Sequence, residues 1–277
     1  MAQNIDLTGR IAVVTGAGSG IGAATARLLA RHGAKVHIAD LNADAAAAVA
    51  GEIGGQNGQA AHHRVDVTRP EDIEALAEAI FTAEGRVDIL HNNAGIGHAG
   101  DIDATTVEDW QRVIGVNLLG VAYGVQAFVP RMLRQGSPAV IVNTASMAGL
   151  FPTAKMAPYC ASKFGVVGMS ESLNAELCSR GIRVVAVCPG VINTAIVRES
   201  TMRGQLAADQ AKLVAFYANR GTSPDTVARA VLAAIARPRP IVVSPRWQVL
   251  VPYLLHRLSP RLTQALASRL TQFASRG

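Results

Sequence analysis

Tyr159 and Lys163, in the stretch PYCASKFG, have types and a spacing that could do proton chemistry. Side chains four residues apart lie on the same face of a helix, and Pro158 suits the first turn of one. A phenol has an ordinary pKa near ~10, and a neighbouring positive charge lowers it toward neutrality. Tyr159 is therefore a candidate general acid or base. The alternative is an aromatic core residue followed by a solvated lysine, because such a pair alone is common on helices.

Strand-length apolar stretches alternate with longer, alanine-rich stretches that must hold these residues in place. This alternation is typical of parallel strands buried on both faces. We expect an α/β fold over residues 1–245, a single-domain Rossmann-like doubly wound parallel sheet with helices on both faces. Ligands should bind beyond the carboxyl ends of its strands. The expected strands are RIAVVTG, KVHIAD, HHRVDV, VDILHNNAG, AVIVNTAS, IRVVAVCPG and IVVS.

Composition limits the class of protein and its partners. The 277 residues are 49% hydrophobic and 17% charged, as in a well-buried globular chain. The net charge of +6 belongs to the tail, since nine arginines and one acid, Asp225, fall from Arg220 onward. The rest shows no basic patch with interleaved aromatics, so we expect no nucleic-acid partner. With no signal peptide and no uninterrupted membrane-spanning apolar run in view, we expect a cytoplasmic location.

The cysteines and histidines indicate no metal or disulfide framework. Cys160, Cys178 and Cys188 show no C-x-x-C pairing, and we expect buried free thiols. The pair His62-His63 lacks metal-ligand spacing, and its rings should lie on opposite faces of a strand. His91 and His98 lie on either side of the NNAG stretch and are interpreted as structural residues.

A glycine turn and a later carboxylate predict a dinucleotide site. TGAGSGIG at 15–22 follows the first expected strand and opens a helix, where glycines and free N–H groups suit a pyrophosphate. Asp40 ends the next strand, where a carboxylate can bind both adenosine ribose hydroxyls and repel a 2′-phosphate. No Lys or Arg in the turn or just after Asp40 offsets that repulsion, so we expect NAD rather than NADP. The alternative for Asp40 is an N-cap of the helix starting near Asn42.

With these motifs in view, the chain resembles the short-chain dehydrogenase/reductase family over residues 15–194. The glycine turn matches T-G-x-x-x-G-x-G, residues 92–95 read N-N-A-G, and PGVINT at 189–194 resembles the nicotinamide-side loop. The cofactor-binding residues that the resemblance implies are Gly16, Ser19, Gly20, Ile21, Gly22, Asp40, Asp66, Val67, Asn93, Ala94, Gly95, Tyr159, Lys163, Pro189, Gly190, Ile192 and Thr194.

The resemblance also implies catalytic roles for Asn117, Ser146, Tyr159 and Lys163. Lys163 would bind the nicotinamide ribose and, with the oxidised cofactor's positive ring, lower the pKa of Tyr159, the general acid or base. Ser146 would stabilise the substrate oxygen, and Asn117 would hold a water in a proton relay. Singly, Ser146 could cap a strand end, Asn117 could satisfy a buried backbone group and Thr194 could cap a helix.

The end of the chain departs from the family pattern. A Val-Asp-Gly-Gly ending, common in compact tetrameric reductases, is absent, which leaves a homodimer or a homotetramer open. The family implies dimerisation through long helices around 106–134 and 158–180. Residues 191–222 are interpreted as a substrate loop, with Ser223 or Thr222 capping the next helix. The extension 246–277 predicts two amphipathic helices broken around Pro260, which could pack on the core, cover the cleft or a neighbouring subunit, or contact an anionic membrane.

These observations favour an NAD-dependent oxidoreductase that interconverts a secondary alcohol and a ketone, with a small, apolar substrate. The alternatives are an NADPH-dependent carbonyl reductase and, from another class, a non-enzymatic NAD-binding or membrane-associated interaction protein. An intact Ser, Tyr and Lys set speaks against the latter. The apolar residues expected around the cleft are Met147, Leu150, Phe151, Met156, Ile196, Val197, Met202 and Phe216.

Overall fold

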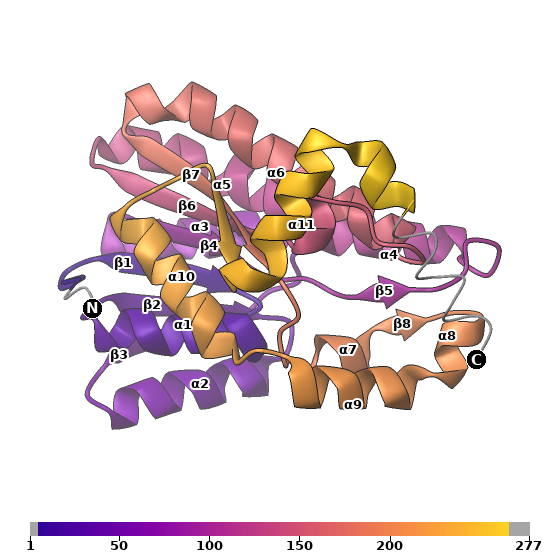
Figure 1. The fold of residues 1–277 in the computed structure, drawn as a ribbon. Coiled ribbons are helices and arrows are strands. Elements are labelled where there is room, and N and C mark those ends of the chain that lie inside the picture. The colour runs from indigo at the N-terminus through magenta and orange to yellow at the C-terminus, as the bar shows by residue number, and fades with distance from the viewer. Residues whose placement is uncertain (1–4, 266–277) are drawn as a thin grey trace.

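One parallel sheet of seven strands forms the centre of the protein, shown here by a computed structural model that describes residues 5–265 (Figure 1). The strand order is β3-β2-β1-β4-β6-β7-β9, so the chain runs outward in one direction from β1 and in the other from β4. This reversal creates the crevice at which such sheets bind ligands. The strands are β1 (Ile11–Thr15), β2 (Lys35–Asp40), β3 (Gln59–Arg64), β4 (Ile89–Asn92), β6 (Ala139–Thr144), β7 (Ile182–Pro189) and β9 (Ile241–Ser244).

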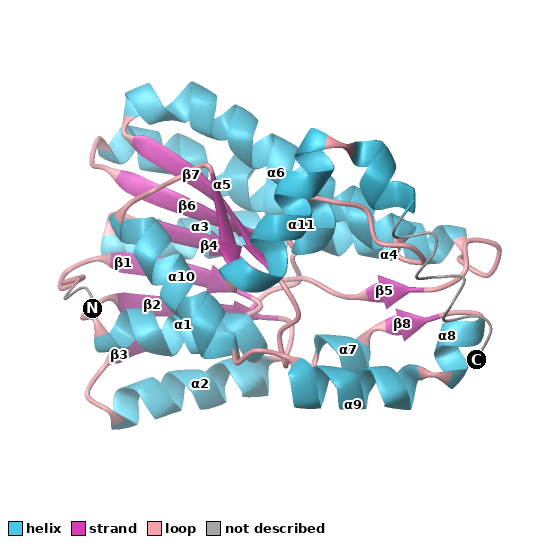
Figure 2. Ribbon diagram, in the orientation of Figure 1, coloured by secondary structure: helices cyan, strands magenta, loops and turns pink. Residues whose placement is uncertain are grey.

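Helices cover both faces of the sheet, with α1, α2 and α10 on one side and α3, α5 and α6 on the other (Figure 2). Alternate residues of β1 enter opposite cores: Val13 packs in the cluster under α3 and α5, while Val14 packs in the cluster under α1. The predicted doubly wound sheet is therefore confirmed. The helices are α1 (Gly20–Arg31), α2 (Ala43–Gly55), α3 (Pro70–Glu84), α4 (Val107–Ile114), α5 (Gly120–Gln135), α6 (Ala157–Leu177) and α10 (Pro224–Ala236).

The third strand lies earlier than its sequence predicts. HHRVDV suggested a strand over residues 62–67, but β3 covers Gln59–Arg64. Because β3 is an edge strand, β2 is its one partner in the sheet, and the pairing ends where Asp40 faces Arg64. The loop that follows carries Asp66 and Val67.

The helix expected around 106–134 runs from Val107 to Gln135, but it is interrupted by a π-helical segment, η1 (Gly115–Leu119). By its length, and by a mean hydropathy of 1.6 over an 18-residue stretch, it could cross a membrane, which qualifies the expectation drawn from the lack of an uninterrupted apolar run. Phe128 and Met132 anchor it in the core beneath the sheet, and core helices of soluble proteins pass the same test. The helix expected over 158–180 is α6, which ends at Leu177 and continues as the 3₁₀ turn η3 (Cys178–Arg180).

Residues 191–222 form a separate layer beyond the carboxyl ends of the strands, here called the lid. Its short strand β8 pairs with β5, a two-residue strand from the body. Ser223 caps the following helix by accepting a hydrogen bond from the Asp225 N–H, as expected. The elements are β5 (His98–Ala99), α7 (Ile196–Glu199), β8 (Thr201–Met202), α8 (Gln205–Ala208) and α9 (Gln210–Arg220).

The extension begins with α11 (Arg246–Leu258), and residues 260–265 resume helical structure after a break at Ser259. The break lies next to Pro260, where the sequence predicts it. The remainder of the extension, residues 266–277, lies outside the described residues.

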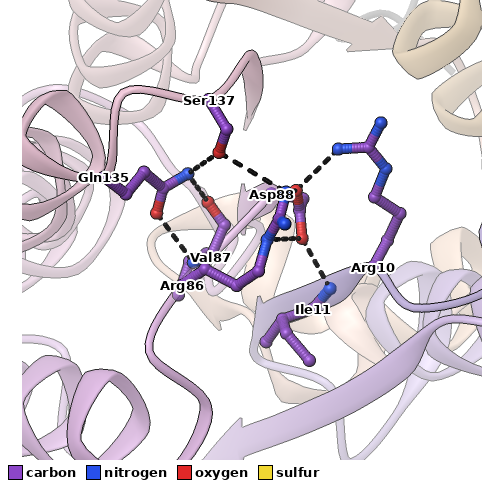
Figure 3. Close-up of polar contacts among 7 residues, drawn as sticks. All are labelled: Arg10, Ile11, Arg86, Val87, Asp88, Gln135 and Ser137. Carbon is purple, nitrogen blue, oxygen red and sulfur yellow. Dashed lines mark hydrogen bonds and ion pairs between the residues drawn. The ribbon is translucent and has the colours of Figure 1, made fainter.

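A buried carboxylate fixes the amino end of the sheet, opposite the ligand-binding end (Figure 3). Asp88, 3% exposed, accepts hydrogen bonds from the Arg10 guanidinium (2.8 Å), the Ile11 N–H (2.9 Å) and the Arg86 Nε (3.1 Å). Burial alone would raise the pKa of Asp88, but these hydrogen bonds outweigh burial and lower it. The ion pairs thus hold β1 and β4 in register at the end remote from the crevice.

Candidate active site

A cavity of about 400 Å³ opens at the carboxyl ends of the strands, between the crevice and the lid. It brings together all but two of the residues that the sequence assigned to the site. The exceptions are Gly22 and Asn117. The predicted residues that line it are Gly16, Ser19, Gly20, Ile21, Asp40, Asp66, Val67, Asn93, Ala94, Gly95, Ser146, Tyr159, Lys163, Pro189, Gly190, Ile192 and Thr194.

The glycine turn brings the start of α1 to the cavity. Gly16 and Gly20 have φ of +62° and +54°, a backbone conformation that favours glycine. Ser19 is the N-cap of α1, yet its side chain makes no capping hydrogen bond. The first N–H groups of α1 therefore have no side-chain cap and suit an anionic ligand. Gly22 does not line the cavity, because its role is packing: a Cβ there would come within 2.2 Å of the Gly16 carbonyl oxygen.

Asp40 lies beside the glycine turn, at the tip of β2. Its Oδ2 accepts a hydrogen bond from the Gly18 N–H (2.8 Å), and its Oδ1 accepts one from the Asn42 N–H (2.9 Å). These bonds aim the carboxylate at the turn. The N-cap of α2 is Asn42, whose side chain accepts from the Ala45 N–H, so the N-cap alternative for Asp40 is wrong.

Ser146, Tyr159 and Lys163 meet on the nicotinamide side of the crevice, beyond the ends of β6 and β7. Ser146 follows β6 and caps the turn η2 (Met147–Gly149), accepting from the Ala148 N–H at 3.2 Å. Lys163 is 3% exposed; its Nζ donates to the Thr144 carbonyl (2.9 Å) and lies 5.7 Å from the centroid of the Tyr159 ring. The helical spacing thus places the ammonium beside the phenol, as predicted.

Burial dominates the electrostatics of this pair in the protein alone. It raises the pKa of Tyr159 to about 12, although the neighbouring Ser146 hydroxyl acts in the opposite direction. Burial lowers the pKa of Lys163 to about 8, so the amine is protonated in most protein molecules at neutral pH. The sequence suggested that Lys163 lowers the pKa of the phenol, but in the protein alone desolvation is the larger effect.

Asn117 lies in the π-helical segment and is fully buried. Its Oδ1 accepts from the Ile96 N–H (2.8 Å), while its Nδ2 donates to the Ile96 carbonyl (2.9 Å) and to Ser162 Oγ (3.3 Å). The side chain therefore satisfies buried backbone groups, the alternative considered for it. A Cβ built on Gly95 would lie 3.2 Å from Asn117 Oδ1 and 3.5 Å from Lys163 Nζ, which shows how tightly this corner is packed. The water-holding role of Asn117 stays a prediction.

Thr15 joins the glycine turn to the NNAG loop, a role that the sequence analysis did not assign. Its hydroxyl accepts hydrogen bonds from the N–H groups of Asn93 (3.0 Å) and Ala94 (3.2 Å). The Asn93 side chain donates in turn to the carbonyls of Thr15 (3.0 Å) and Gly16 (3.1 Å). Asn93 is therefore held as a structural support of the crevice. A threonine directly before the first glycine was the available signal.

The apolar wall of the cavity comes partly from residues that the sequence did not single out. Met147, Met156, Ile196 and Val197 line it as expected, whereas the other predicted cleft residues do not. Those are Leu150, Phe151, Met202 and Phe216. Leu150 is 4% exposed and buried in the core, and Phe216 is 50% exposed on α9. The adjacent Tyr217 faces the cavity instead, because neighbouring residues of a helix point about 100° apart.

An ion pair with a buried carboxylate joins the lid to the body. Arg203, just after β8, donates from Nε (2.9 Å) and Nη2 (3.0 Å) to the carboxylate of Asp109, which is 4% exposed at the start of α4. The hydrogen bond from Arg203 is the main reason that the pKa of Asp109 lies far below its usual range. The Arg203 N–H also donates to the Ala99 carbonyl at 3.0 Å. These contacts fix the lid beside the crevice.

The remaining histidines and cysteines are structural. His91 is fully buried with Nε2 2.9 Å from Thr144 Oγ1, and burial lowers its pKa to about 3. His98 is buried beside Asp109, with its Nε2 3.6 Å from a carboxylate oxygen. On β3, His62 is exposed while His63 stacks on His37, so their rings lie on opposite faces as predicted. All three cysteines are free thiols; Cys178 is half-buried rather than buried.

The fold and this site define a dinucleotide-binding α/β protein with a serine, a tyrosine and a lysine gathered at the mouth of the crevice. A family model described as short chain dehydrogenase matches residues 10–204. The chain belongs to the short-chain dehydrogenase/reductase family.

Known proteins with similar sequences and structures span the same family. The probable oxidoreductase EphD of Mycobacterium tuberculosis is 38% identical over 262 residues, 92% of this chain and 43% of EphD, so the chain spans less than half of EphD. Cyclohexanol dehydrogenase of an Acinetobacter species is 41% identical over 191 residues, 69% of this chain and 76% of that protein. A Burkholderia phymatum short chain dehydrogenase/reductase solved in complex with NAD has a TM-score of 0.86 at 34% identity, covering 93% of this chain and 96% of that one.

Proposed function

We propose that the protein is an NAD-dependent oxidoreductase that interconverts a secondary alcohol and a ketone on an apolar substrate. The observation that carries the proposal is the position of Tyr159, which lines the cavity beside Ser146 and Lys163. The same cavity extends to Asp40 at the carboxyl end of β2. One continuous site thus holds an acid/base group at one end and a ribose-binding carboxylate at the other.

The residues present fit a nicotinamide dinucleotide. The uncapped N–H groups at the start of α1 suit the pyrophosphate, Asp40 suits the adenosine ribose hydroxyls, and Lys163 suits the hydroxyls of the nicotinamide ribose. When bound, the cofactor supplies the acceptor or donor of the hydride. The protein contributes binding, orientation and proton transfer.

Proton transfer is assigned to Tyr159. In the oxidation direction, the phenolate oxygen of Tyr159 accepts the proton of the substrate hydroxyl. Ser146 donates a hydrogen bond to the substrate oxygen. The buried ammonium of Lys163 stabilises the phenolate, which burial would otherwise disfavour. In the reverse direction, the Tyr159 hydroxyl returns the proton to the carbonyl oxygen.

The preference for NAD over NADP rests on charge. Asp40 and Asp66 line the end of the cavity proposed for the adenosine. Among the described residues that line the cavity, Lys163 is the single cation, and it lies away from that end. A 2′-phosphate would therefore face carboxylates with no compensating positive charge. The alternative, an NADPH-dependent reductase, would need such a cation.

The substrate class rests on the wall between Tyr159 and the lid. Met147, Met156, Ile196 and Val197 make it largely apolar, so an alicyclic or aliphatic secondary alcohol fits better than a charged one. Cyclohexanol dehydrogenase, a relative, carries the name of such a substrate.

The proposal is tested by mixing the protein with NAD or NADP and a panel of cyclic, straight-chain and aromatic secondary alcohols, and by following the absorbance of the reduced nicotinamide. We expect turnover with NAD and apolar alcohols, and little with NADP. NAD binding without turnover in either direction would favour the non-enzymatic alternative. Turnover with NADP preferred over NAD would favour the reductase.

For the assembly we propose a dimer formed through the long helices α4-η1-α5 and α6. Val107, Leu119 and Phe164 on these helices are 66%, 41% and 41% exposed, an apolar surface that a second copy would cover. Phe164→Glu should produce monomers in sedimentation velocity, whereas Ile102→Glu, a control at an exposed apolar residue off these helices, should not. A dimer that survives Phe164→Glu would point to another interface.

A further inference from the structure

The helix α11 exposes a continuous apolar surface that the proposed catalysis does not use. Trp247, Val251, Leu254, Leu255 and Leu258 follow the spacing of one face of α11, and Leu262 lies in the helical turn after the break at Ser259. Half of the twelve large hydrophobic residues exposed in the described chain belong to this surface, with Trp247 at 74% and Leu258 at 83%. We call it the apolar ridge and define it as Trp247, Val251, Leu254, Leu255, Leu258 and Leu262.

The opposite side of α11 holds the helix in place, so the apolar ridge cannot turn inward. Val249 is fully buried in the cluster that includes Leu150 and Val166. Gln248 Oε1 accepts a hydrogen bond from the Val191 N–H at 2.7 Å. A Cβ built on Gly190 would come within 2.3 Å of Gln248, so the helix sits directly against the loop after β7. The orientation of the ridge toward solvent is therefore fixed by packing on the body.

Positive charge without negative partners borders the ridge. Arg246, Arg257 and Arg261 are exposed, and the sequence from residue 226 to residue 277 contains eight arginines and no aspartate or glutamate. Arg257 donates to the Tyr253 hydroxyl at 3.2 Å, a neutral partner. Among the described residues, no salt bridge involves an arginine beyond residue 225. The surface is therefore apolar and cationic together.

We infer that α11 and the turn after it form a binding surface for an anionic lipid membrane. The part of the ridge on α11, from Trp247 to Leu258, spans about 16 Å along the helix, which suits a helix lying flat in the headgroup region. Tryptophan favours that interface, and arginines flanking an apolar face bind anionic headgroups while their stems cover apolar surface.

Charge distinguishes the membrane from a second copy of the chain. If α11 packed on α11 of another copy, two arginine-bearing segments without a carboxylate would be brought together, which is unfavourable. Anionic headgroups instead supply the missing negative charge and cover the ridge.

Co-sedimentation of the full-length protein with vesicles tests the inference. We expect binding to phosphatidylcholine vesicles that contain phosphatidylglycerol, little binding to phosphatidylcholine alone, and weaker binding at high salt. Trp247→Ser combined with Leu258→Ser should abolish it. Arg246→Gln, Arg257→Gln and Arg261→Gln together should weaken it on the order of a hundredfold, since each basic residue near the surface contributes about fivefold.

Matched controls distinguish binding through the ridge from nonspecific binding through exposed apolar or charged residues elsewhere. Ile102→Ser removes an exposed apolar side chain elsewhere, and Arg31→Gln, Arg134→Gln and Arg183→Gln remove three exposed charges from the body. Both controls should bind vesicles like the wild type.

Tryptophan fluorescence provides a second readout. In a Trp110→Phe background, Trp247 is the remaining tryptophan, and its emission should shift to the blue with anionic vesicles. Absence of vesicle binding by the wild type overturns the inference, as does binding that the ridge variant retains. Wild-type oligomers that dissociate in the ridge variant, without vesicle binding, would make a second copy the occupant and also overturn it.

Discussion

The Nζ atom of Lys163 lies 5.7 Å from the centroid of the Tyr159 ring, and both side chains lie at the mouth of the same cavity. The amine is fixed there by its hydrogen bond to the Thr144 carbonyl. Even so, burial raises the pKa of the phenol to about 12 in the protein alone. Proton transfer near neutrality therefore requires further positive charge, which the oxidised nicotinamide ring carries. The proposed mechanism therefore couples cofactor binding to acid/base catalysis at Tyr159.

The first prediction is that NAD lowers the pKa of Tyr159. A second positive charge near the phenol favours phenolate, so the titration should move from about 12 toward neutral pH when NAD binds. The measurement is the phenolate absorbance difference between the wild type and Tyr159→Phe as pH rises, with and without NAD. Lys163→Met should reduce the shift. Identical titrations with and without NAD would show that the coupling does not exist.

Asp40→Ala should change the choice of cofactor. Loss of the carboxylate removes hydrogen bonds to the ribose and the repulsion of a 2′-phosphate, so the Kd of NAD should rise about tenfold while that of NADP falls. Quenching of protein fluorescence measures both. Asp44→Ala, in the first turn of α2 and absent from the cavity lining, is the control. An unchanged ratio of the two Kd values would reject Asp40 as the discriminating residue.

Loss of the Arg203–Asp109 ion pair should loosen the lid. Arg203 is 42% exposed, so solvent screens the pair and the effect of its loss should be modest. In Arg203→Gln the KM of the alcohol should therefore rise about fivefold while the Kd of NAD changes less, because the lid covers the substrate side. Arg180→Gln, in η3 and paired at the surface with Glu176 of α6, is the control. A KM equal to that of the wild type would show that this ion pair does not position the lid.

Acid should destabilise the protein through His63. Burial lowers its pKa to about 4, whereas an unfolded histidine titrates near 6.5. The unfolded chain thus binds more protons between these values, so the free energy of unfolding falls as pH drops from 6.5 to about 4, by on the order of 2 kcal/mol once solvent screening of the half-buried ring is allowed for. His63→Gln should flatten this dependence in urea titrations. His62→Gln, on the exposed face of β3, keeps the His37–His63 hydrogen bond and is the control; a His63→Gln curve parallel to the wild type would contradict the assignment.

Local patterns predicted the sheet and the crevice because their signals lie in neighbouring residues. KVHIAD matches β2 in both bounds, and Pro70 marks the start of α3. The glycine turn and Asp40 lie on consecutive elements whose carboxyl ends must meet, so their convergence followed from topology alone. The meeting of Ser146 and Tyr159 was instead implied by the resemblance to the family.

Contacts between segments far apart in the chain could not be predicted from the sequence. Asp109 and Arg203 are 94 residues apart, and the strands β5 and β8 have two residues each, too short for a periodic signal. The choice of Phe216 over Tyr217 for the cavity failed because the rotation of α9 is set by its packing against α7 and α8, which the sequence does not reveal. The pKa of Tyr159 depends on burial, which a charge pattern does not reveal.

The central claim is that Tyr159 transfers the substrate proton in the complex with NAD. Tyr159→Phe removes the hydroxyl and keeps the ring, so kcat should fall by a factor on the order of 10³ while the Kd of NAD stays within about threefold. Tyr217→Phe, in the same cavity, should keep most of the activity. The most direct measurement is reduction of NAD by the best alcohol of the panel with both variants. Turnover by Tyr159→Phe at the wild-type rate would contradict the account.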